Sequence, residues 1–300
     1  MPSISALYVY PVKSCGGIAV SEVRLLPTGL EYDRNWMVTN PAGRMLTQRS
    51  HARLALVEVA LDEHDLILSA PGMAALRTPL AIESTASMQN VTVSIWDDTV
   101  QAFDTGPEAA GWFSSFLGEA ARLVRFDPSV PRPADARWTG GIAATAQFSD
   151  GFPLLVIGES SLDDLNTRLT GKGAPSIPMN RFRPNLVIGG LDAYEEDYVE
   201  QVTIQAWDGI EAARATSGER AVQLNLIKPC ARCPIPTIDQ ATGAPHADWP
   251  NEPLDTMATY RGNARLDGAL TFGQNAIVAA GEGAVLALGQ TVDAELSFGD

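Results

Sequence analysis

The sequence predicts a mainly β protein with some α (α+β), organised as two β-rich domains, which suits a length of 300 residues. The first observation is a series of short β-branched and aromatic runs in residues 1–105, separated by clusters of Gly, Pro, Asn and Asp. The second is a stretch of helical periodicity that follows them. The third is a proline-rich segment beyond that stretch, which predicts the domain boundary.

The first third of the chain is expected to form strands joined by hairpins. Turn clusters at residues 40–43, 62–64 and 96–98 each separate two apolar or alternating runs. The expected strands are 6–12, 18–26, 36–38, 44–47, 54–61, 65–69, 91–95 and 99–103. Repeated hairpins at this spacing are typical of an antiparallel barrel or of a sandwich.

The middle of the chain contains the helical stretch and the expected boundary. Apolar residues at helical spacing predict a helix over residues 107–123. Three prolines then fall within residues 126–134, which is the composition of a linker. We therefore place the split near residues 124–138, with domains at 1–124 and 125–300.

The second half is expected to mix strands with one helix. Its expected strands are 153–157, 185–188, 202–207 and 223–227, followed by a last hairpin of 276–279 with 284–288. A helix is expected from Ser160 or Ser161, as the N-cap, to Leu169. Asp163 and Asp164 in its first turn favour the helix dipole.

The charge and the cysteine count limit the class of protein. With 21 Lys and Arg against 36 Asp and Glu, the net charge is −15, so partners that require basic surface, nucleic acid and anionic membrane, are excluded. The three cysteines, Cys15, Cys230 and Cys233, are too few for a disulfide framework or a common ferredoxin cluster. We expect no signal peptide and no transmembrane helix, because no run of about 18 uncharged apolar residues exists. The expected location is the cytoplasm.

The segment 228–239 carries the sharpest chemical signal, the pair Cys230 and Cys233. A structural zinc site needs further local Cys or His ligands, which are missing, and the prolines after Cys233 oppose a thioredoxin-like helix. Two alternatives stay open. The cysteines are either small buried hydrophobes, or a reactive thiolate favoured by the nearby charges of Lys228 and Arg232.

Two further kinds of motif suit an anion. Lys13 and Ser14 precede two glycines after an expected strand, and this combination can cradle a phosphate, although no Walker loop is present. Arg34 and Arg183 each stand beside aromatic residues at a strand edge, and a guanidinium can bind phosphate or a polar heterocycle with two hydrogen bonds. Each motif by itself also suits an ordinary turn or a surface cation.

Taken together, these segments resemble one family, the MOSC family. The matching segments, in order, are YPVKSCGG, DRNW, FPLLVIGESSLDDLN, RFRPNLVI, KPCARCPIPTIDQATG and FGQN. The resemblance covers nearly the whole chain, and it is to proteins with a MOSC N-terminal β-barrel domain followed by a MOSC domain. Bacterial YcbX-type proteins and the mitochondrial amidoxime-reducing component are of this kind. It implies two β-barrel-like domains, the MOSC N-terminal domain and the MOSC domain.

The resemblance implies a molybdenum cofactor, molybdenum-molybdopterin, whose metal takes a protein thiolate. The matching position is Cys233, and thiolate is a suitable soft ligand. The positions that match cofactor contacts are Lys13, Ser14, Arg34, Asp150, Gly151, Phe152, Arg183, Asn185 and Arg232. Relatives often carry hydroxyl residues where Gly151 and Phe152 stand, so contacts there would be made by the backbone. Asp239 is expected to serve as a catalytic proton relay.

The activity that the resemblance implies is the reduction of N-hydroxylated small molecules such as amidoximes, hydroxylamines and N-hydroxylated bases. No cysteine follows Cys233, so electrons are expected from a separate redox protein of the ferredoxin, flavodoxin or cytochrome type with its reductase. The alternative is a cofactor-binding or sulfur-carrier role, with a persulfide on Cys233, as in cofactor sulfurases. A module without cofactor is disfavoured, because both thiols of the pair and four cations, Lys13, Arg34, Arg183 and Arg232, are present.

Overall fold

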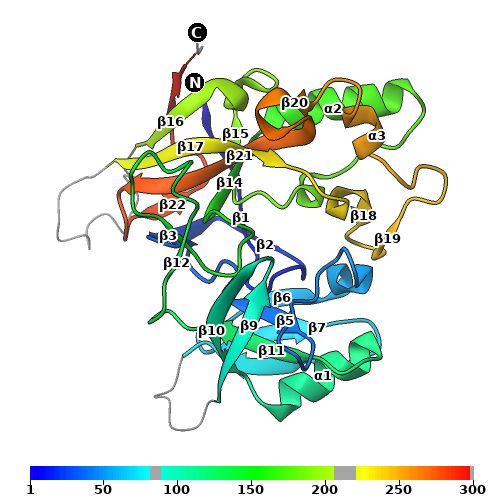
Figure 1. Ribbon diagram of the computed structural model, residues 1–300. Helices are drawn as coiled ribbons and strands as arrows, with labels where there is room; N and C mark the ends of the chain where they lie inside the picture. The colour runs from blue at the N-terminus through cyan, green and yellow to red at the C-terminus, as the bar shows by residue number, and fades with distance from the viewer. Residues whose placement is uncertain (82–88, 206–220, 298–300) are drawn as a thin grey trace.

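The computed structural model describes residues 1–81, 89–205 and 221–297, which form two bodies (Figure 1). We call residues 36–126 the lower body and the remaining described elements the upper body. The upper body is built on a nine-stranded sheet in the order β2-β1-β15-β14-β21-β17-β16-β23, with β20 added to β21. Its strands are β1 Ser3–Val9, β2 Ile18–Val20, β14 Leu154–Gly158, β15 Leu186–Gly189, β16 Val199–Ile204, β17 Val222–Ala231, β20 Gly262–Asn263, β21 Ala269–Ala280 and β23 Val292–Leu296.

The first two strands belong to the large sheet of the upper body. β1 pairs antiparallel with β15, with Leu7 opposite Leu186, and β2 pairs with β1. Leu7 and Leu186 are buried in the same apolar core as the rest of this sheet. Between β1 and β2, Val12 forms a bridge with Trp36 and the Lys13 N–H donates to the Trp36 carbonyl at 2.8 Å. The segment after β1 is therefore held at the junction of the two bodies.

The lower body contains two smaller antiparallel sheets and the helix α1 Pro107–Leu117 (Figure 1). One sheet has the order β5-β11-β10-β9 and the other the order β6-β7-β8. The helix buries Trp112, Phe113 and Phe116 in an apolar core that it shares with neighbouring strands. This burial explains why its apolar residues recur at helical spacing. The strands are β5 Trp36–Thr39, β6 Glu58–Leu61, β7 Asp65–Ser69, β8 Leu76–Pro79, β9 Asn90–Ile95, β10 Asp98–Asp104 and β11 Arg122–Phe126.

The remaining elements complete the upper body. They are β3 Glu22–Leu26, β4 Gly29–Leu30, β12 Arg132–Pro133, β13 Thr145–Ala146, β18 Ile238–Asp239, β19 Ala244–Pro245, β22 Val285–Ala287, α2 Glu159–Gly171 and α3 Leu254–Met257. Within the described residues, no helix combines the length and the apolar character needed to cross a bilayer.

The predicted class, mainly β with a few helices, is confirmed. The barrel-like closure of the domains is not. Among the described residues the strand pairings give open sheets, and the large sheet runs from an edge at β2 to an edge at β23. The hairpins around residues 62–64 and 96–98 are present as predicted, as β6–β7 and β9–β10.

The predicted helix over 107–123 ends earlier than expected. Gly118 adopts a left-handed conformation with φ of 77° and its N–H binds the carbonyl of Ser114, which closes the helix. The following apolar residues form β11, with Leu123 opposite Val38 of β5. The pairing of β11 with β5 therefore overrides the helical spacing of the last residues of the predicted helix.

Four other local predictions are wrong in whole or in part. The last hairpin does not form, because β22 pairs with β3, with Leu286 opposite Val23. Neither Ser160 nor Ser161 caps α2, which follows Gly158 without a side-chain cap, and the Ser161 hydroxyl instead donates to Glu196 at 2.7 Å. Residues 44–47 make isolated bridges and no strand, and residues 52–56 form a 3₁₀ turn before β6. Of the strand predicted over 202–207, the last two residues lie outside the described part.

Candidate functional site

A cleft opens between the two bodies, and most of the predicted site residues line it. Those residues are Lys13, Ser14, Arg34, Asp150, Phe152, Arg183, Asn185, Arg232 and Cys233. They come from loops at the ends of β1, β4, β13 and β17 and from the segment before β15. Gly151 and Asp239 are not among the lining residues. A Cβ atom on Gly151 would meet no atom within 4 Å, so this glycine borders open space.

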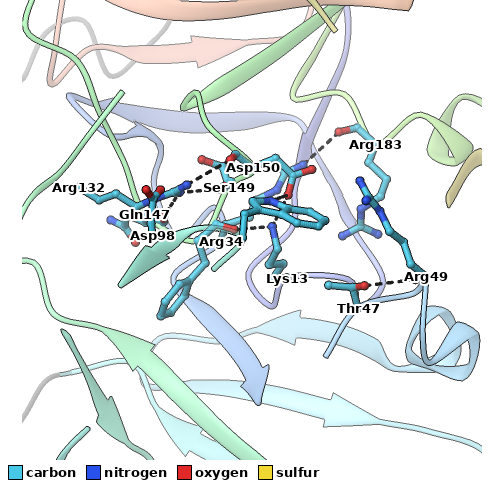
Figure 2. Close-up of polar contacts among 12 residues, drawn as sticks. Lys13, Arg34, Thr47, Arg49, Asp98, Arg132, Gln147, Ser149, Asp150 and Arg183 are labelled. Atoms are coloured by element: carbon cyan, nitrogen blue, oxygen red, sulfur yellow. Dashed lines mark hydrogen bonds and ion pairs between the residues drawn. The ribbon is translucent and has the colours of Figure 1, made fainter. Parts of the chain in front are cut away.

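Lys13 and Asp150 form an ion pair across the cleft wall (Figure 2). The Lys13 ammonium donates to the Asp150 carboxylate at 2.5 Å and to the carbonyl of Phe148 at 2.8 Å. Burial lowers the pKa of Lys13, and the charge of Asp150 opposes that shift. Desolvation raises the pKa of Asp150, but Lys13 and the indole N–H of Trp96 favour the charged form more strongly, so its pKa is lowered. The Asp150 carboxyl group is therefore held in its charged form.

Arg34 is held by the aspartate that precedes it. Its Nη1 donates to both carboxylate oxygens of Asp33 at 2.6 Å, and its Nη2 donates to the carbonyl of Arg183 at 3.1 Å. Asp33 is buried and also accepts the backbone N–H of Tyr10 at 2.8 Å. Burial raises the pKa of Asp33, whereas the Arg34 guanidinium lowers it. This arrangement fixes the Arg34 guanidinium 4.3 Å from the centre of the Tyr10 ring.

Arg183 has a guanidinium with an unused donor. Its Nη1 donates to the carbonyl of Cys15 at 2.6 Å, and its guanidinium also lies 4.3 Å from the Tyr10 ring centre. Burial lowers its pKa to about 10, so it stays protonated at neutral pH. Nη2 of Arg183 and the hydroxyl of Ser149 are buried without a hydrogen-bond partner among the described residues. Buried polar atoms are nearly always paired, so these two donors are available to an acceptor brought into the cleft.

Strained backbone is concentrated around the cleft. Ser14, Arg34, Trp96 and Arg183 have φ values of 68°, 52°, 54° and 58°, and all four line the cleft. The left-handed conformation costs a non-glycine residue roughly 1–3 kcal/mol, and such residues cluster at functional sites. The rest of the fold therefore stabilises these strained conformations, which set the directions of the four side chains at the cleft.

Cys230 and Cys233 both line the cleft, at the end of β17 and just beyond it. The Arg232 guanidinium donates to the sulfur of Cys230 at 2.9 Å and to the carbonyl of Phe182. In the described part of the chain no residue hydrogen-bonds to the Cys233 thiol. Nor do three His, Cys, Asp or Glu side chains gather into a metal cluster there. A metal held by Cys233 would thus need ligands from a bound group.

The third cysteine lies outside this cleft. Cys15 is fully buried, and burial raises the pKa of its thiol to about 12. It packs with the core of the lower body, beside Val12 and Trp36. A thiol that stays protonated in an apolar core is a poor nucleophile and a poor metal ligand.

Asn185 and Asp239 each bind other parts of the fold, in addition to the cofactor contact and the proton relay predicted for them. The Asn185 amide accepts the N–H of Leu155 at 3.1 Å and donates to the carbonyl of Tyr8 at 3.2 Å, which ties β14 to β1. The Asp239 carboxylate binds the Arg181 guanidinium at 2.7 Å. Burial raises the pKa of Asp239, but backbone N–H groups and the charge of Arg181 outweigh it, so the pKa is lowered. Arg181 lines the cleft, and its contact with Asp239 connects that carboxylate to the cleft.

Several lining residues were not predicted, among them Arg49 and Trp96. The Trp96 indole N–H donates to Asp150 at 3.1 Å, and the Arg49 guanidinium lies 4.3 Å from the Trp96 ring centre. Trp96 occupies a hairpin turn, where a large aromatic residue is unusual. This unusual placement is the feature of the sequence that could have marked Trp96 as a site residue. Nothing in the spacing around Arg49 marks it, because the lower body brings it to the cleft.

Comparison with known proteins gives consistent results. The MOSC N-terminal beta barrel domain matches residues 1–120 and the MOSC domain matches residues 143–293. The chain is 35% identical to mitochondrial amidoxime-reducing component 1 of Mus musculus, covering 86% of this chain and 71% of that protein. It is 34% identical to mitochondrial amidoxime reducing component 2 of Bos taurus and of Homo sapiens, covering 86% of this chain and 72% of each relative. The chain therefore belongs to the MOSC family, with the MOSC N-terminal domain followed by the MOSC domain.

Proposed function

We propose that this protein is a molybdenum-cofactor-dependent reductase of N-hydroxylated small molecules, with Cys233 as the protein ligand of the metal. The observation that carries the proposal is the meeting of the Cys233 thiol with Lys13, Arg34 and Arg183 around one cleft. The names of the relatives, amidoxime-reducing components, support the substrate class.

The residues present fit a molybdenum-molybdopterin cofactor. Its terminal phosphate is an anion, and the cleft offers the cations Lys13, Arg34 and Arg183. The unpaired Nη2 of Arg183 and the hydroxyl of Ser149 are donors that lack acceptors. Thiolate is a suitable soft ligand for such a metal, and among the described residues no group hydrogen-bonds to the Cys233 sulfur. When bound, the metal centre supplies the two-electron chemistry that breaks the N–O bond.

The overall reaction sets what the chain itself must provide. The substrate N–O bond breaks and two electrons are taken up. One proton goes to the nitrogen, which becomes the amine, and the other goes to the hydroxyl oxygen, which leaves as water. We propose that the electrons come from a separate redox protein of the ferredoxin, flavodoxin or cytochrome type. The protons must cross the cleft, where the partly exposed Asp150 carboxylate, held by Lys13, is the carboxylate that borders it. Asp239 would contribute by keeping Arg181 in place.

Metal analysis and activity test the proposal together. The protein is produced in cells that supply the cofactor, and molybdenum content and the reduction of benzamidoxime by a chemical reductant are measured. We expect wild-type protein to hold molybdenum and to form benzamidine, and Cys233→Ser to lose both. Cys230→Ser is the matched variant, and it should keep the metal. Full molybdenum and full activity in Cys233→Ser would refute the assignment, and a mass increase of one sulfur atom on Cys233 without molybdenum would favour the sulfur-carrier alternative.

A further inference from the structure

Arg132 lies in the proline-rich segment that the sequence predicts to be a linker, yet its side chain is only 7% exposed. It begins β12, where it pairs with Ala146 of β13. Figure 2 shows its guanidinium beside Asp98, Gln147 and Ser149. A buried cation in a connecting segment needs an explanation, because burial of an unpaired charge is costly.

The guanidinium donates four hydrogen bonds, each to a different acceptor. Nε donates to the Asp98 carboxylate at 2.7 Å, and Nη1 donates to the carbonyls of Gln147 and Ser149 at 2.9 and 2.7 Å. Nη2 donates to the carbonyl of Asp150 at 3.1 Å. Three carbonyls from residues 147–150 thus converge on one planar fork, a geometry that a lysine ammonium cannot reproduce.

The same loop, residues 147–150, supplies the partners of Lys13. The carbonyl of Phe148 and the carboxylate of Asp150 are the two acceptors of its ammonium. The acid on the other side of Arg132, Asp98, opens the strand that follows Trp96, and Trp96 donates to Asp150. Arg132 therefore joins the loop and the hairpin that together form this wall of the cleft.

We infer that Arg132 is a positioning residue of the cleft: it fixes residues 147–150 so that Lys13 is presented to the anionic group of the bound cofactor. Arg132 itself is not among the lining residues, so it acts through Lys13 and Asp150. The second half of this inference rests on the proposed function. The first half, the placement of Lys13, can be measured without any cofactor.

The test compares Arg132→Lys and Arg132→Gln with a matched control. Arg132→Lys keeps the charge and the contact to Asp98 but loses the fork. Arg137→Gln is the control, because Arg137 follows shortly after the proline-rich segment, is exposed, and in the described part of the chain pairs with Asp135. All variants are produced as the full chain, and their melting temperatures are recorded.

The readout that does not depend on cofactor is acetylation of lysines by acetic anhydride, followed by mass spectrometry. Lys13 is buried and Lys172 is exposed, so Lys172 serves as the internal reference. We expect the Lys13 to Lys172 labelling ratio to rise about tenfold in Arg132→Gln, the effect of losing roughly one charged hydrogen bond on Lys13. Arg132→Lys should show a smaller rise, and Arg137→Gln none. An unchanged ratio in Arg132→Gln would overturn the inference, whatever happens to the melting temperature.

The second readout is molybdenum bound per protein at limiting cofactor. We expect it to fall in the order wild type, Arg132→Lys, Arg132→Gln, with Arg137→Gln at the wild-type level. A raised labelling ratio together with wild-type molybdenum in Arg132→Gln would refute the role toward the cofactor. If wild-type protein bound no molybdenum, the proposed function would fail, and the labelling ratio alone would still decide whether Arg132 places Lys13.

Discussion

Lys13 and Asp150 form an ion pair of unequal burial: the lysine side chain is 8% exposed and the aspartate side chain is 65% exposed. The buried partner depends on the exposed one, because among the described residues the acceptors of the Lys13 ammonium are the Asp150 carboxylate and the Phe148 carbonyl. The segments that meet here come from residues 13 and 150, far apart in the sequence. The pair therefore couples the loop after β1 to the loop before β14.

Replacing Asp150 by asparagine should destabilise the fold modestly. The substitution leaves the buried Lys13 ammonium with a weaker acceptor, and we expect a loss of about 1–2 kcal/mol in the free energy of unfolding, at the lower end for a charged hydrogen bond because the carboxylate is exposed. Urea denaturation at pH 7 measures this. Asp135→Asn, which removes an exposed pair with Arg137, should have a clearly smaller effect on the free energy of unfolding. Equal losses in the two variants would contradict the structural role of the pair.

Asp239 should contribute stability that depends on pH. Its folded-state pKa is lowered by the N–H groups of Ala241 and Thr242 and by Arg181, against the effect of burial. A depressed carboxyl pKa stabilises the fold above the unfolded pKa of about 3.9, and that contribution is lost as pH falls through the folded pKa. Asp239→Asn should therefore lower the urea midpoint at pH 7 and have progressively less effect below about pH 4. A difference from wild type that stayed constant with pH would argue against ionisation as the cause.

Ser14→Gly should separate stability from binding. Ser14 has φ of 68°, so glycine relieves strain, and we expect the apoprotein to become up to about 1 kcal/mol more stable. The comparison change Ser115→Gly, in the last turn of α1, should instead cost roughly 0.5 kcal/mol, because glycine is the poorer helix former. The opposite signs are checked by urea denaturation. Molybdenum content should fall in Ser14→Gly if the hydroxyl contacts the cofactor, and destabilisation by this variant would show that the backbone is not strained.

The three cysteines should differ sharply in reactivity. Cys15 is buried with a pKa raised to about 12, whereas Cys230 and Cys233 border the cleft. Iodoacetamide at pH 8 should label the native apoprotein at Cys230 and Cys233 only, because the thiolate is the nucleophile. Peptide mass spectrometry locates the label, and urea-unfolded protein should be labelled at all three cysteines. Label on Cys15 in the native protein would show that its core opens readily.

Arg183→Met should weaken cofactor binding more than it weakens the fold. The guanidinium is buried with one unpaired nitrogen and no carboxylate partner among the described residues, so its desolvation is poorly compensated. We expect the free energy of unfolding of the apoprotein to fall by no more than about 1 kcal/mol, chiefly from the lost bond to the Cys15 carbonyl. Molybdenum content should drop to background. Normal metal content in Arg183→Met would remove this residue from the cofactor site.

The sequence predicted local features well where one segment determines them. The hairpins at residues 62–64 and 96–98 follow from turn residues between alternating runs, and both are present. The helix α1 follows from apolar spacing, but its end was missed because the residues of β11 also suit a helix until Leu123 finds Val38 across the sheet. The pairing of β22 with β3 could not be predicted either, because the sequence of a strand does not show which other strand it will pair with.

By itself the sequence determined the mainly β class, the acidic charge, and the candidate residues with their family resemblance, because each of these is carried by residue types and their order along the chain. Only the tertiary structure decided which of them meet. It brought the Lys13 loop, the Arg183 segment and the Cys233 segment to one cleft, turned Asp239 toward Arg181, and added Arg49 and Trp96. It also buried Arg132 in what had the composition of a linker. Long-range contacts form where side chains pack well and where buried charges find partners. Both depend on residues from distant segments, so the residue spacing within one segment does not reveal them.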